Sequence, residues 1–234
     1  MTSINRRDVL AGGVVLGLGL PAAAHAKAPI QRVWRFDNLK SIGGASVRVE
    51  GEPKLVAGPS GKAIQFDGVD DALFIGDHPL AGAKNFTFEA VFRPDGGVFE
   101  QRWFHLESDT NPPSKPGLGT TRMLFEVRVL EDQWYLDAFM RGPGYNKPML
   151  VPEKLHPVGR WHHVAQTYDG TMYRSYVNAV LQMESPVEFS PQGPGTASVG
   201  VRMNRVHYFK GAVHSARFTH TALSPAQFKG VIRS

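Results

Sequence analysis

The sequence predicts an all-β fold, a sandwich or barrel of antiparallel strands. Short runs of β-branched and aromatic residues recur at roughly the 8–12-residue spacing that such folds show. The 25 glycines and 17 prolines fall largely between these runs, where turns require them. Helical periodicity is almost absent, and a chain of 234 residues is long enough for one sandwich around a single core.

The predicted strands follow one another with no boundary that separates two cores. The clearest is 86–93, whose alternation places Phe86, Phe88, Ala90 and Phe92 on one buried face. A meander spans 160–183, with turns at Asp169-Gly170 and Asn178-Ala179. The remaining strands are expected at 32–36, 63–66, 72–75, 98–106, 122–129, 133–141, 197–201 and 208–218, with two weak runs within 46–55, exposed loops at 111–119 and 142–146, and a short helix from Ser224.

Residues 1–26 are predicted to form an export signal, which leaves 27–234 as the mature domain. Arg6-Arg7 supplies the charged start, and Val9–Leu20 is an apolar run too short for a comfortable membrane span. Ala24-His25-Ala26 offers the small residues of a cleavage site. The mature protein is therefore expected in the periplasm or outside the cell, with no integral membrane segment after cleavage.

Residues 5–10, with the sequence Asn-Arg-Arg-Asp-Val-Leu, resemble a twin-arginine export signal. Val9 stands where that family usually has phenylalanine, so an ordinary secretory signal is the alternative. The chain has no cysteine, which excludes disulfides, thiolate metal sites and a lipoprotein anchor. A twin-arginine substrate folds in the reducing cytoplasm before export, and a cysteine-free chain suits that route.

The charge of the chain argues against a nucleic-acid partner. The formal net charge is +5, and removing residues 1–26, with their two arginines and one aspartate, leaves +4. The basic residues are scattered and form no stripe, so nucleic-acid binding is not expected. An acidic polysaccharide is compatible with this charge but is not implied by it.

Several motifs in a fixed order resemble one fold family. Phe66–Asp71, Phe86–Ala90 and Gly159–Ala165 are similar to segments of laminin-G-like, concanavalin A-like lectin and glucanase domains. Tyr168-Asp169-Gly170, Tyr176–Ala179 and the stretch from Tyr208 to Pro225 continue the pattern. The resemblance covers nearly all of the mature chain and implies a jelly-roll sandwich of two antiparallel sheets. It is much less specific for function, because this sandwich hosts lectins, adhesion modules, glycosidases and polysaccharide lyases.

The chain departs from the family at two positions. Asn178-Ala179 replaces the usual Asn-Gly, and because alanine is disfavoured at positive φ, a different turn type is expected there. His214 stands where the family often has an aspartate that serves a structural calcium, which puts that calcium in doubt. The other candidate metal ligands are carboxylates in two loops, for which a plain polar turn is the alternative. They are Asp37, Asp67, Asp70 and Asp71.

His162 and His163 are expected to pack within the sheet and not to form a site. Adjacent residues of a strand point to opposite faces, so the two rings cannot easily share one metal ion.

The hairpin over 122–141 is the candidate site. Its apolar residues alternate, so the predicted register sets Phe125 against Ala138 and Val127 against Leu136. The other face then places Glu126 opposite Asp137, Arg128 opposite Tyr135, and Arg122 opposite Arg141, and opposed like charges require an explanation. A solvated salt-bridge face, a glycan-binding groove and a catalytic carboxylate pair all remain open. The residues expected at a groove are Trp103, His105, Arg122, Glu126, Arg128, Tyr135, Asp137 and Arg141, with Phe139 and Tyr145 as neighbours.

The resulting functional hypothesis is an exported glycan-binding or adhesion module without catalysis. A polysaccharide-cleaving glycosidase or lyase is the first alternative, with Glu126 and Asp137 as weak catalytic candidates, since cross-strand carboxylates lie near the ~5 Å separation of retaining glycosidases. The paired-glutamate strand motif of the related glucanases is absent. A structural protein-interaction domain is the second alternative.

Overall fold

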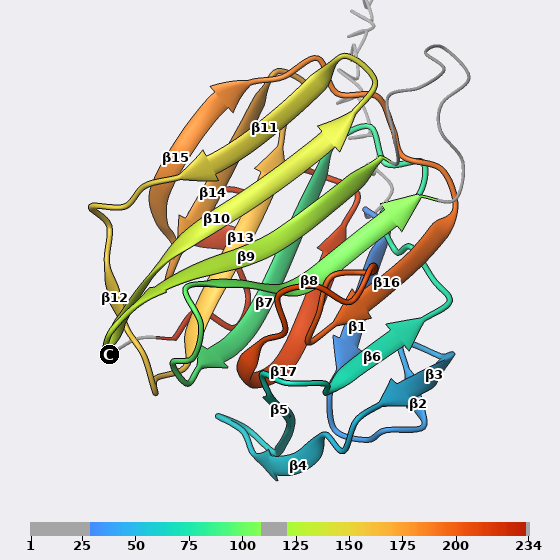
Figure 1. The fold of residues 1–234 in the computed structure, drawn as a ribbon. Helices are drawn as coiled ribbons and strands as arrows, with labels where there is room; N and C mark the ends of the chain where they lie inside the picture. The colour runs from blue at the N-terminus through green and yellow to red at the C-terminus, as the bar shows by residue number, and fades with distance from the viewer. Residues whose placement is uncertain (1–28, 109–120, 233–234) are drawn as a thin grey trace, which may run out of the picture.

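A computed structural model describes residues 29–108 and 121–232 and shows the predicted all-β sandwich (Figure 1). Two antiparallel sheets lie face to face, as the resemblance implied. The expected export signal at 1–26 and the expected loop at 111–119 lie outside the described residues. Within the described ranges, no helix has the length and apolarity that a membrane span requires.

The first sheet has eight strands, of which β7 and β17 lie at the centre. Its order is β15 (Val180–Pro186), β14 (Met172–Val177), β13 (His162–Tyr168), β7 (Phe86–Pro94), β17 (Lys210–Thr219), β5 (Lys62–Asp67) and β4 (Lys54–Ala57), with β1 (Gln31–Arg35) also paired to β17.

The second sheet has nine strands and carries the predicted hairpin. Its order is β11 (Tyr145–Leu150), β10 (Gln133–Gly142), β9 (Arg122–Leu130), β8 (Glu100–Ser108), β16 (Gly195–Val199), β6 (Ala72–Ile75), β3 (Ala45–Glu50) and β2 (Ser41–Ile42), with β12 (His156–Pro157) paired to β10.

Aromatic side chains from both sheets fill the space between them. The predicted inward face of β7 is confirmed, because Phe86, Phe88, Ala90 and Phe92 all belong to the main core cluster. The ring of Phe88 contacts Phe125 of the opposite sheet at a centroid distance of 4.5 Å. Burial of such large apolar rings is the main favourable term in folding, so the two sheets depend on each other for stability.

The meander of β13, β14 and β15 forms as predicted, and its histidines point to opposite faces. His162 packs against Trp134 in the core, whereas His163 Nε2 lies 3.1 Å from Glu89 Oε1 on the outer side. The expected change of turn type at Asn178-Ala179 is wrong. Both residues have positive φ, 48° and 66°, so the chain retains the two-residue turn that normally takes Asn-Gly.

One further expectation is corrected by the structure. The region 142–146 is not an exposed loop, because Gly142 pairs with Tyr145 at the start of β11, and Tyr145 is buried in the core. The short helix expected from Ser224 is confirmed as a 3₁₀ turn, Pro225–Gln227, in which the Ser224 N–H donates to Gln227 Oε1 at 2.9 Å.

Candidate functional site

The register of β9 and β10 agrees with the prediction at every pair. Phe125 lies opposite Ala138, and Val127 lies opposite Leu136, with all four side chains in the core. The intervening residues therefore point to the outer face of the nine-stranded sheet, because strand side chains alternate.

This outer face is built from rows of residues that run across β8, β9, β10 and β11. One row is Arg102, Glu126, Asp137 and Leu150, beside the row Glu100, Arg128 and Tyr135. The next row is apolar apart from His105 and contains Leu124, Phe139 and Pro148. Beyond it lies the row Glu107, Arg122, Arg141 and Asn146.

A β-bulge in β8 decides which of its residues reach this face. The register shifts between Arg102 and Phe104, so Trp103 is the extra residue. Trp103 and Phe104 consequently both face the core. The Trp103 ring stacks on Phe92, with centroids 4.1 Å apart, and on Phe125 at 5.4 Å. Trp103, expected beside the groove, is therefore part of the sandwich interior.

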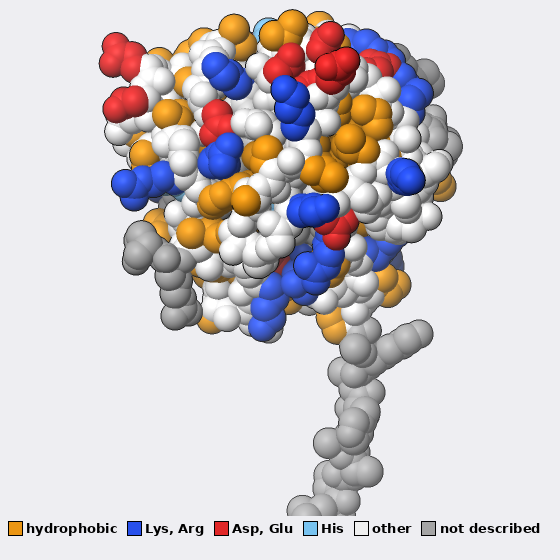
Figure 2. All heavy atoms as spheres, turned by 90° about the horizontal axis from the view of Figure 1, so that it is seen from below, with side chains coloured by type: hydrophobic (Ala, Val, Ile, Leu, Met, Phe, Trp, Pro, Cys, Tyr) orange, Lys and Arg blue, Asp and Glu red, His pale blue; other side chains and the backbone are white. Residues whose placement is uncertain are grey.

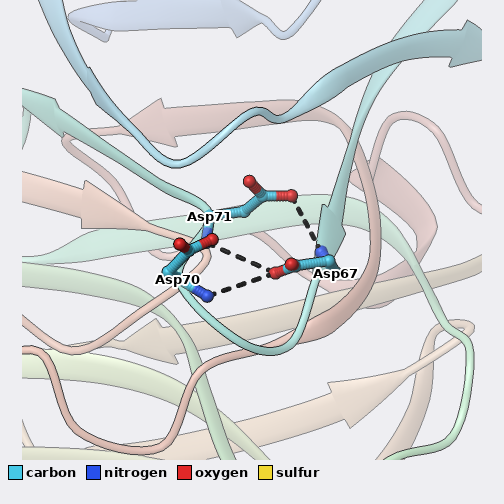
Figure 3. A group of neighbouring side chains, drawn as sticks. All are labelled: Asp67, Asp70 and Asp71. Carbon is cyan, nitrogen blue, oxygen red and sulfur yellow. Dashed lines mark hydrogen bonds between the residues drawn. The ribbon is translucent and has the colours of Figure 1, made fainter.

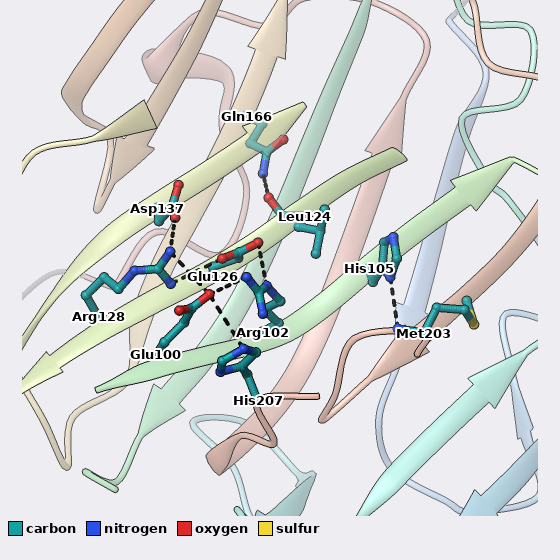
Figure 4. A network of polar contacts seen from close by, with 10 residues as sticks. All are labelled: Glu100, Arg102, His105, Leu124, Glu126, Arg128, Asp137, Gln166, Met203 and His207. Carbon is teal, nitrogen blue, oxygen red and sulfur yellow. Dashed lines mark hydrogen bonds and ion pairs between the residues drawn. The ribbon is translucent and has the colours of Figure 1, made fainter. Parts of the chain in front are cut away.

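Two arginines hold together three carboxylates in the first two rows (Figure 4). Arg128 donates to Asp137 Oδ2 at 2.6 Å and to Glu126 Oε2 at 3.2 Å. Arg102 donates to Glu126 Oε1 at 3.0 Å and also pairs with Glu100. The opposed carboxylates of Glu126 and Asp137 are thus bridged by guanidinium groups, which offsets their mutual repulsion.

The two opposed carboxylates differ in their surroundings. Asp137 is 2% exposed, and burial together with the charge of Glu126 raises the pKa of its carboxyl to about 7, although Arg128 acts in the other direction. Glu126 accepts hydrogen bonds from two arginines. The raised pKa favours the neutral form of the Asp137 carboxyl at this position.

The segment 200–209 between β16 and β17 covers the outer side of β8. The Met203 N–H donates to His105 Nδ1 at 3.0 Å, and the Arg102 N–H donates to the His207 carbonyl at 2.9 Å. His105 is buried, and burial and nearby arginines hold its pKa well below the usual range, so the ring is neutral. His105 therefore supports this segment and does not line an open groove.

A cavity of about 180 Å³ opens on this face between the charged rows. The Arg122 guanidinium lies 5.3 Å from the centre of the Phe139 ring on its floor. Burial and the neighbouring charges of Arg202 and Arg141 lower the pKa of Arg122 to about 10. The cavity is lined by Arg102, Arg122, Glu126, Arg128, Asp137, Phe139, Pro148, Leu150 and Arg202.

The structure thus brings together four of the predicted groove residues and the predicted neighbour Phe139. Arg122, Glu126, Arg128 and Asp137 line the cavity. Tyr135 is buried beside Arg128, Arg141 lies next to the cavity opposite Arg122, and Tyr145 packs against Phe189 in the core.

Sequence reasoning missed Arg102 and Arg202. Arg102 follows from the alternation of β8 once the bulge is known, but the bulge has no distinct signal in the sequence. Arg202 lies 80 residues from Arg122 in the chain, and only the return of segment 200–209 over β8 brings them to one cavity.

The three predicted aspartates of the loop after β5 do form a cluster (Figure 3). Their nearest carboxylate oxygens lie within 4.8 Å of one another, at the edge of a cavity of about 580 Å³ that Lys54 and Lys210 also line. Asp71 accepts the Glu52 N–H at 2.6 Å and the Asp67 N–H at 3.0 Å, one on each oxygen. Asp67 Oδ1 accepts the N–H groups of residues 69, 70 and 71.

These contacts do not fit a calcium site as it stands. Calcium takes six to eight oxygen ligands, whereas most oxygens of Asp67 and Asp71 already satisfy backbone donors and two lysines are near. Burial acts to raise the pKa of Asp67, but its backbone donors outweigh burial and the pKa is lowered. The cluster is thus organised as a polar turn, which was the alternative from sequence.

The remaining metal candidate, Asp37, lies elsewhere, as does His214, which replaces the aspartate of the family. Asp37 is exposed and accepts a hydrogen bond from the Asn38 amide. His214 contacts the Ser60 carbonyl through Nε2 at 2.6 Å and the Ser215 hydroxyl through Nδ1 at 3.0 Å. Neither belongs to the aspartate cluster.

On the face seen from below, basic and acidic side chains are mixed with apolar ones (Figure 2).

Comparison with known proteins identifies the fold family. A family model described as the concanavalin A-like lectin/glucanases superfamily matches residues 67–229. No curated protein matches the sequence.

Similar solved structures share the fold at low identity. Domain 4 of AbnA, a GH43 extracellular arabinanase from Geobacillus stearothermophilus in complex with arabinotriose, is 17% identical with a TM-score of 0.65, and the match covers 86% of this chain and 97% of that domain. The binding domain of Paraclostridial Mosquitocidal Protein 1 is 10% identical (TM-score 0.60; 86% of this chain and 50% of that chain). A Trypanosoma rangeli sialidase in complex with the inhibitor DANA is 11% identical (TM-score 0.56; 83% and 31%).

Proposed function

We propose that this chain, which belongs to the concanavalin A-like lectin/glucanases superfamily, binds a glycan on the outer face of β8, β9, β10 and β11 without cleaving it. The observation that carries the proposal is the cavity that combines arginine and carboxylate groups with a floor of Phe139, Pro148 and Leu150. The hydroxyls of a sugar form hydrogen bonds with guanidinium and carboxylate groups, and its C–H faces pack on apolar side chains. Ligand-binding sites commonly combine polar and apolar groups in this way.

The solved structures give limited support. The arabinanase domain was solved with arabinotriose, and the present chain matches nearly the whole of that domain. At 17% identity the likeness concerns the fold, and a fold alone does not determine function. The proposal therefore depends on the cavity and not on the neighbour.

The contacts of the carboxylates favour binding over catalysis. A retaining glycosidase needs one carboxylate free to attack the sugar and one acid able to protonate the leaving oxygen. Glu126 accepts from Arg102 and Arg128, and both its oxygens are engaged. Attack by Glu126 would require breaking these charge-assisted hydrogen bonds.

One observation favours the catalytic alternative, a polysaccharide-cleaving enzyme. The pKa of the Asp137 carboxyl is raised to about 7, and this carboxyl lies opposite Glu126 on the neighbouring strand. An acid with a raised pKa beside a second carboxyl is an arrangement that glycoside hydrolysis uses.

One assay separates these functions. The mature protein is incubated with neutral and acidic polysaccharides, and both retention of the protein and new reducing or unsaturated ends are measured. Retention without products supports the binding proposal, and products that disappear in Asp137→Asn establish the catalytic alternative. No retention and no products across the panel contradict both and favour a protein partner.

We also place this binding outside the cytoplasm. The support is the charged, apolar and small-residue pattern of residues 1–26. Replacing Arg6 and Arg7 together by lysine is expected to retain the unprocessed protein in the cytoplasm if the twin-arginine route is used. Unchanged export would indicate the ordinary secretory route, and an unprocessed wild-type protein in the cytoplasm would contradict the proposed location.

A further inference from the structure

We propose that the glycan is acidic and that a sugar carboxylate binds in the cavity between Arg122 and Arg202. This inference rests on the proposed glycan-binding function and specifies its ligand class.

The charges on the outer face are unevenly distributed, and Glu126 and Asp137 line the same cavity as Arg122 and Arg202. Glu100, Glu126 and Asp137 lie on one side with Arg102 and Arg128. Among the described residues, the ion pairs of these carboxylates are with Arg102, Arg128 and His207. The apolar row of Leu124, Phe139 and Pro148 separates them from the row that contains Arg122 and Arg141. The second row has two arginines for one carboxylate, Glu107.

Arg202 adds a further positive charge at this place. It comes from segment 200–209 and lines the same cavity as Arg122. Within the described residues, the Arg202 side chain forms no hydrogen bond or ion pair, and burial and the charge of Arg102 lower its pKa. Like charges held close together in a half-buried site repel one another, and an anion placed between them removes that repulsion.

The geometry suits a carboxylate in particular. A guanidinium presents parallel N–H groups that match the two oxygens of a carboxylate. The cavity of about 180 Å³ is smaller than the ~300–1,000 Å³ of sites that enclose whole drug-sized ligands. It therefore holds one charged group with part of its ring, while the rest of a chain lies outside along the strands.

The apolar row completes the site. Phe139 lies beneath the Arg122 guanidinium, and Pro148 and Leu150 continue the floor on β11. A sugar ring whose carboxylate reaches Arg122 and Arg202 can place its C–H face on this floor. Recognition then needs both the charge and the ring, which distinguishes an acidic sugar from a free inorganic anion.

The strand that supports this floor is fixed by main-chain pairing. Phe139 pairs with Leu124 and Pro148, and Arg122 pairs with Arg141 and Glu107. Side chains on a rigid sheet are held more accurately than side chains on loops. Only Arg202 comes from a connecting segment, so it is the residue that can be changed with least effect on the sheet.

The test compares matched glycans. Polygalacturonate, alginate and hyaluronan are each paired with a carboxyl-reduced form of the same polymer, and arabinan and xylan serve as neutral polymers. We expect at least one acidic polymer to bind tenfold or more tightly than its reduced form, with affinity falling as salt is raised from 50 to 500 mM.

Variants then locate the site. Arg202→Gln is expected to weaken binding of the acidic polymer at least fivefold without lowering Tm. Arg35→Gln, an exposed arginine on β1 of the other sheet, removes the same charge elsewhere and is expected to leave affinity unchanged within twofold. Equal weakening by both variants would show a general charge effect and overturn the proposed site.

The remaining outcomes are also decisive. Equal binding of acidic and reduced polymers, or binding of neutral polymers alone, overturns the acidic ligand but leaves glycan binding intact. Dextran sulfate that competes as well as the acidic polymer overturns the carboxylate assignment. Absence of binding to every polymer contradicts the proposed glycan-binding function itself.

Discussion

Ala179 adopts a backbone conformation that is unfavourable for an L-amino acid. Its φ is 66°, and it follows Asn178 at φ 48° in the turn between β14 and β15. The strands around it are fixed by the pairing of Val177 with Val180, and Asn178 Oδ1 accepts the His163 N–H at 2.9 Å. Tertiary contacts thus hold the turn in a conformation that Ala179 opposes by about 1 kcal/mol.

Ala179→Gly is therefore expected to stabilise the protein by about 0.5–1 kcal/mol, because glycine accepts positive φ without a steric cost. The midpoint of urea unfolding measures the change. Ala197→Gly, in strand β16 of the core, is the control and is expected to destabilise. A lower midpoint for Ala179→Gly would contradict the strained-turn interpretation.

Trp103 shows what sequence alternation cannot reveal at a single residue. A regular strand through 100–108 would place Trp103 and Phe104 on opposite faces, and the sequence alone therefore predicts Trp103 beside the groove. The bulge turns both inward, because the space between Phe92 and Phe125 accommodates the indole ring. The free energy gained by burying the indole ring outweighs the loss of regular strand pairing at the bulge. The residues that bury the ring include Phe92 of the opposite sheet, so the sequence of β8 alone does not reveal the bulge.

At the level of elements, the β9–β10 hairpin was predicted correctly from its sequence. Its apolar residues alternate over the whole length, and a shift of one residue would bury Glu126, Arg128 and Asp137 in the core. By contrast, β11 and segment 200–209 contain few alternating residues, so nothing local indicated that they complete the site. The position of Arg202 arises from tertiary packing on β8, which the sequence pattern does not encode.

The pKa of Asp137 predicts a pH dependence of stability. Its folded pKa, about 7, exceeds that of an ordinary aspartate, so between these two pKa values the folded state binds a proton that the unfolded state releases. The stabilisation from this carboxyl is thus complete below the unfolded pKa and is lost as pH rises through about 7.

Asp137→Asn is expected to remove this dependence. The difference in free energy of unfolding between wild type and variant should shift by at least ~1 kcal/mol between pH 5 and pH 8, with wild type relatively more stable at pH 5. Urea unfolding at both pH values measures it. Glu153→Gln, at an exposed position, is the control. A difference that is constant with pH would contradict the raised pKa.

Calcium bound at the aspartate cluster would stabilise the whole molecule, because it would crosslink the loop after β5. Asp67 and Asp71 already organise that loop by accepting backbone N–H groups, and Lys54 and Lys210 line the adjacent cavity. We therefore expect 5 mM calcium chloride, compared with 5 mM EDTA, to change Tm by less than about 1 °C, since a ligand that does not bind cannot stabilise. A rise of several degrees, lost in Asp70→Asn, would show a calcium site.

The two sheets of the molecule differ in what covers their outer faces. Leu223, Phe228 and Val231 pack against Ala165 and Tyr176 on the eight-stranded sheet. The Lys229 N–H donates to Glu89 Oε1 at 2.7 Å. The C-terminal segment thus covers part of the outer face of β7, β13 and β14, and the cavity lined by Arg122 and Arg202 lies on the other sheet.

Phe228→Ala tests this division. The Phe228 ring is almost fully buried against Tyr176, with centroids 5.2 Å apart, and against His163 at 5.5 Å. Loss of a buried phenylalanine costs about 3–5 kcal/mol, so we expect a reduction of about 3 kcal/mol here, where the ring lies at the surface of the sandwich. Val180→Ala, at an exposed apolar position, should change stability by less than about 0.5 kcal/mol.

Glycan binding by the Phe228→Ala variant then distinguishes the two faces. Because Phe228 lies on the eight-stranded sheet and the cavity on the nine-stranded sheet, the folded variant is expected to bind with wild-type affinity at 10 °C. Near-ultraviolet circular dichroism at that temperature confirms that the variant is folded. A folded variant that has lost binding would place the ligand on the face that the C-terminal segment covers, and the site on β8–β11 would be wrong.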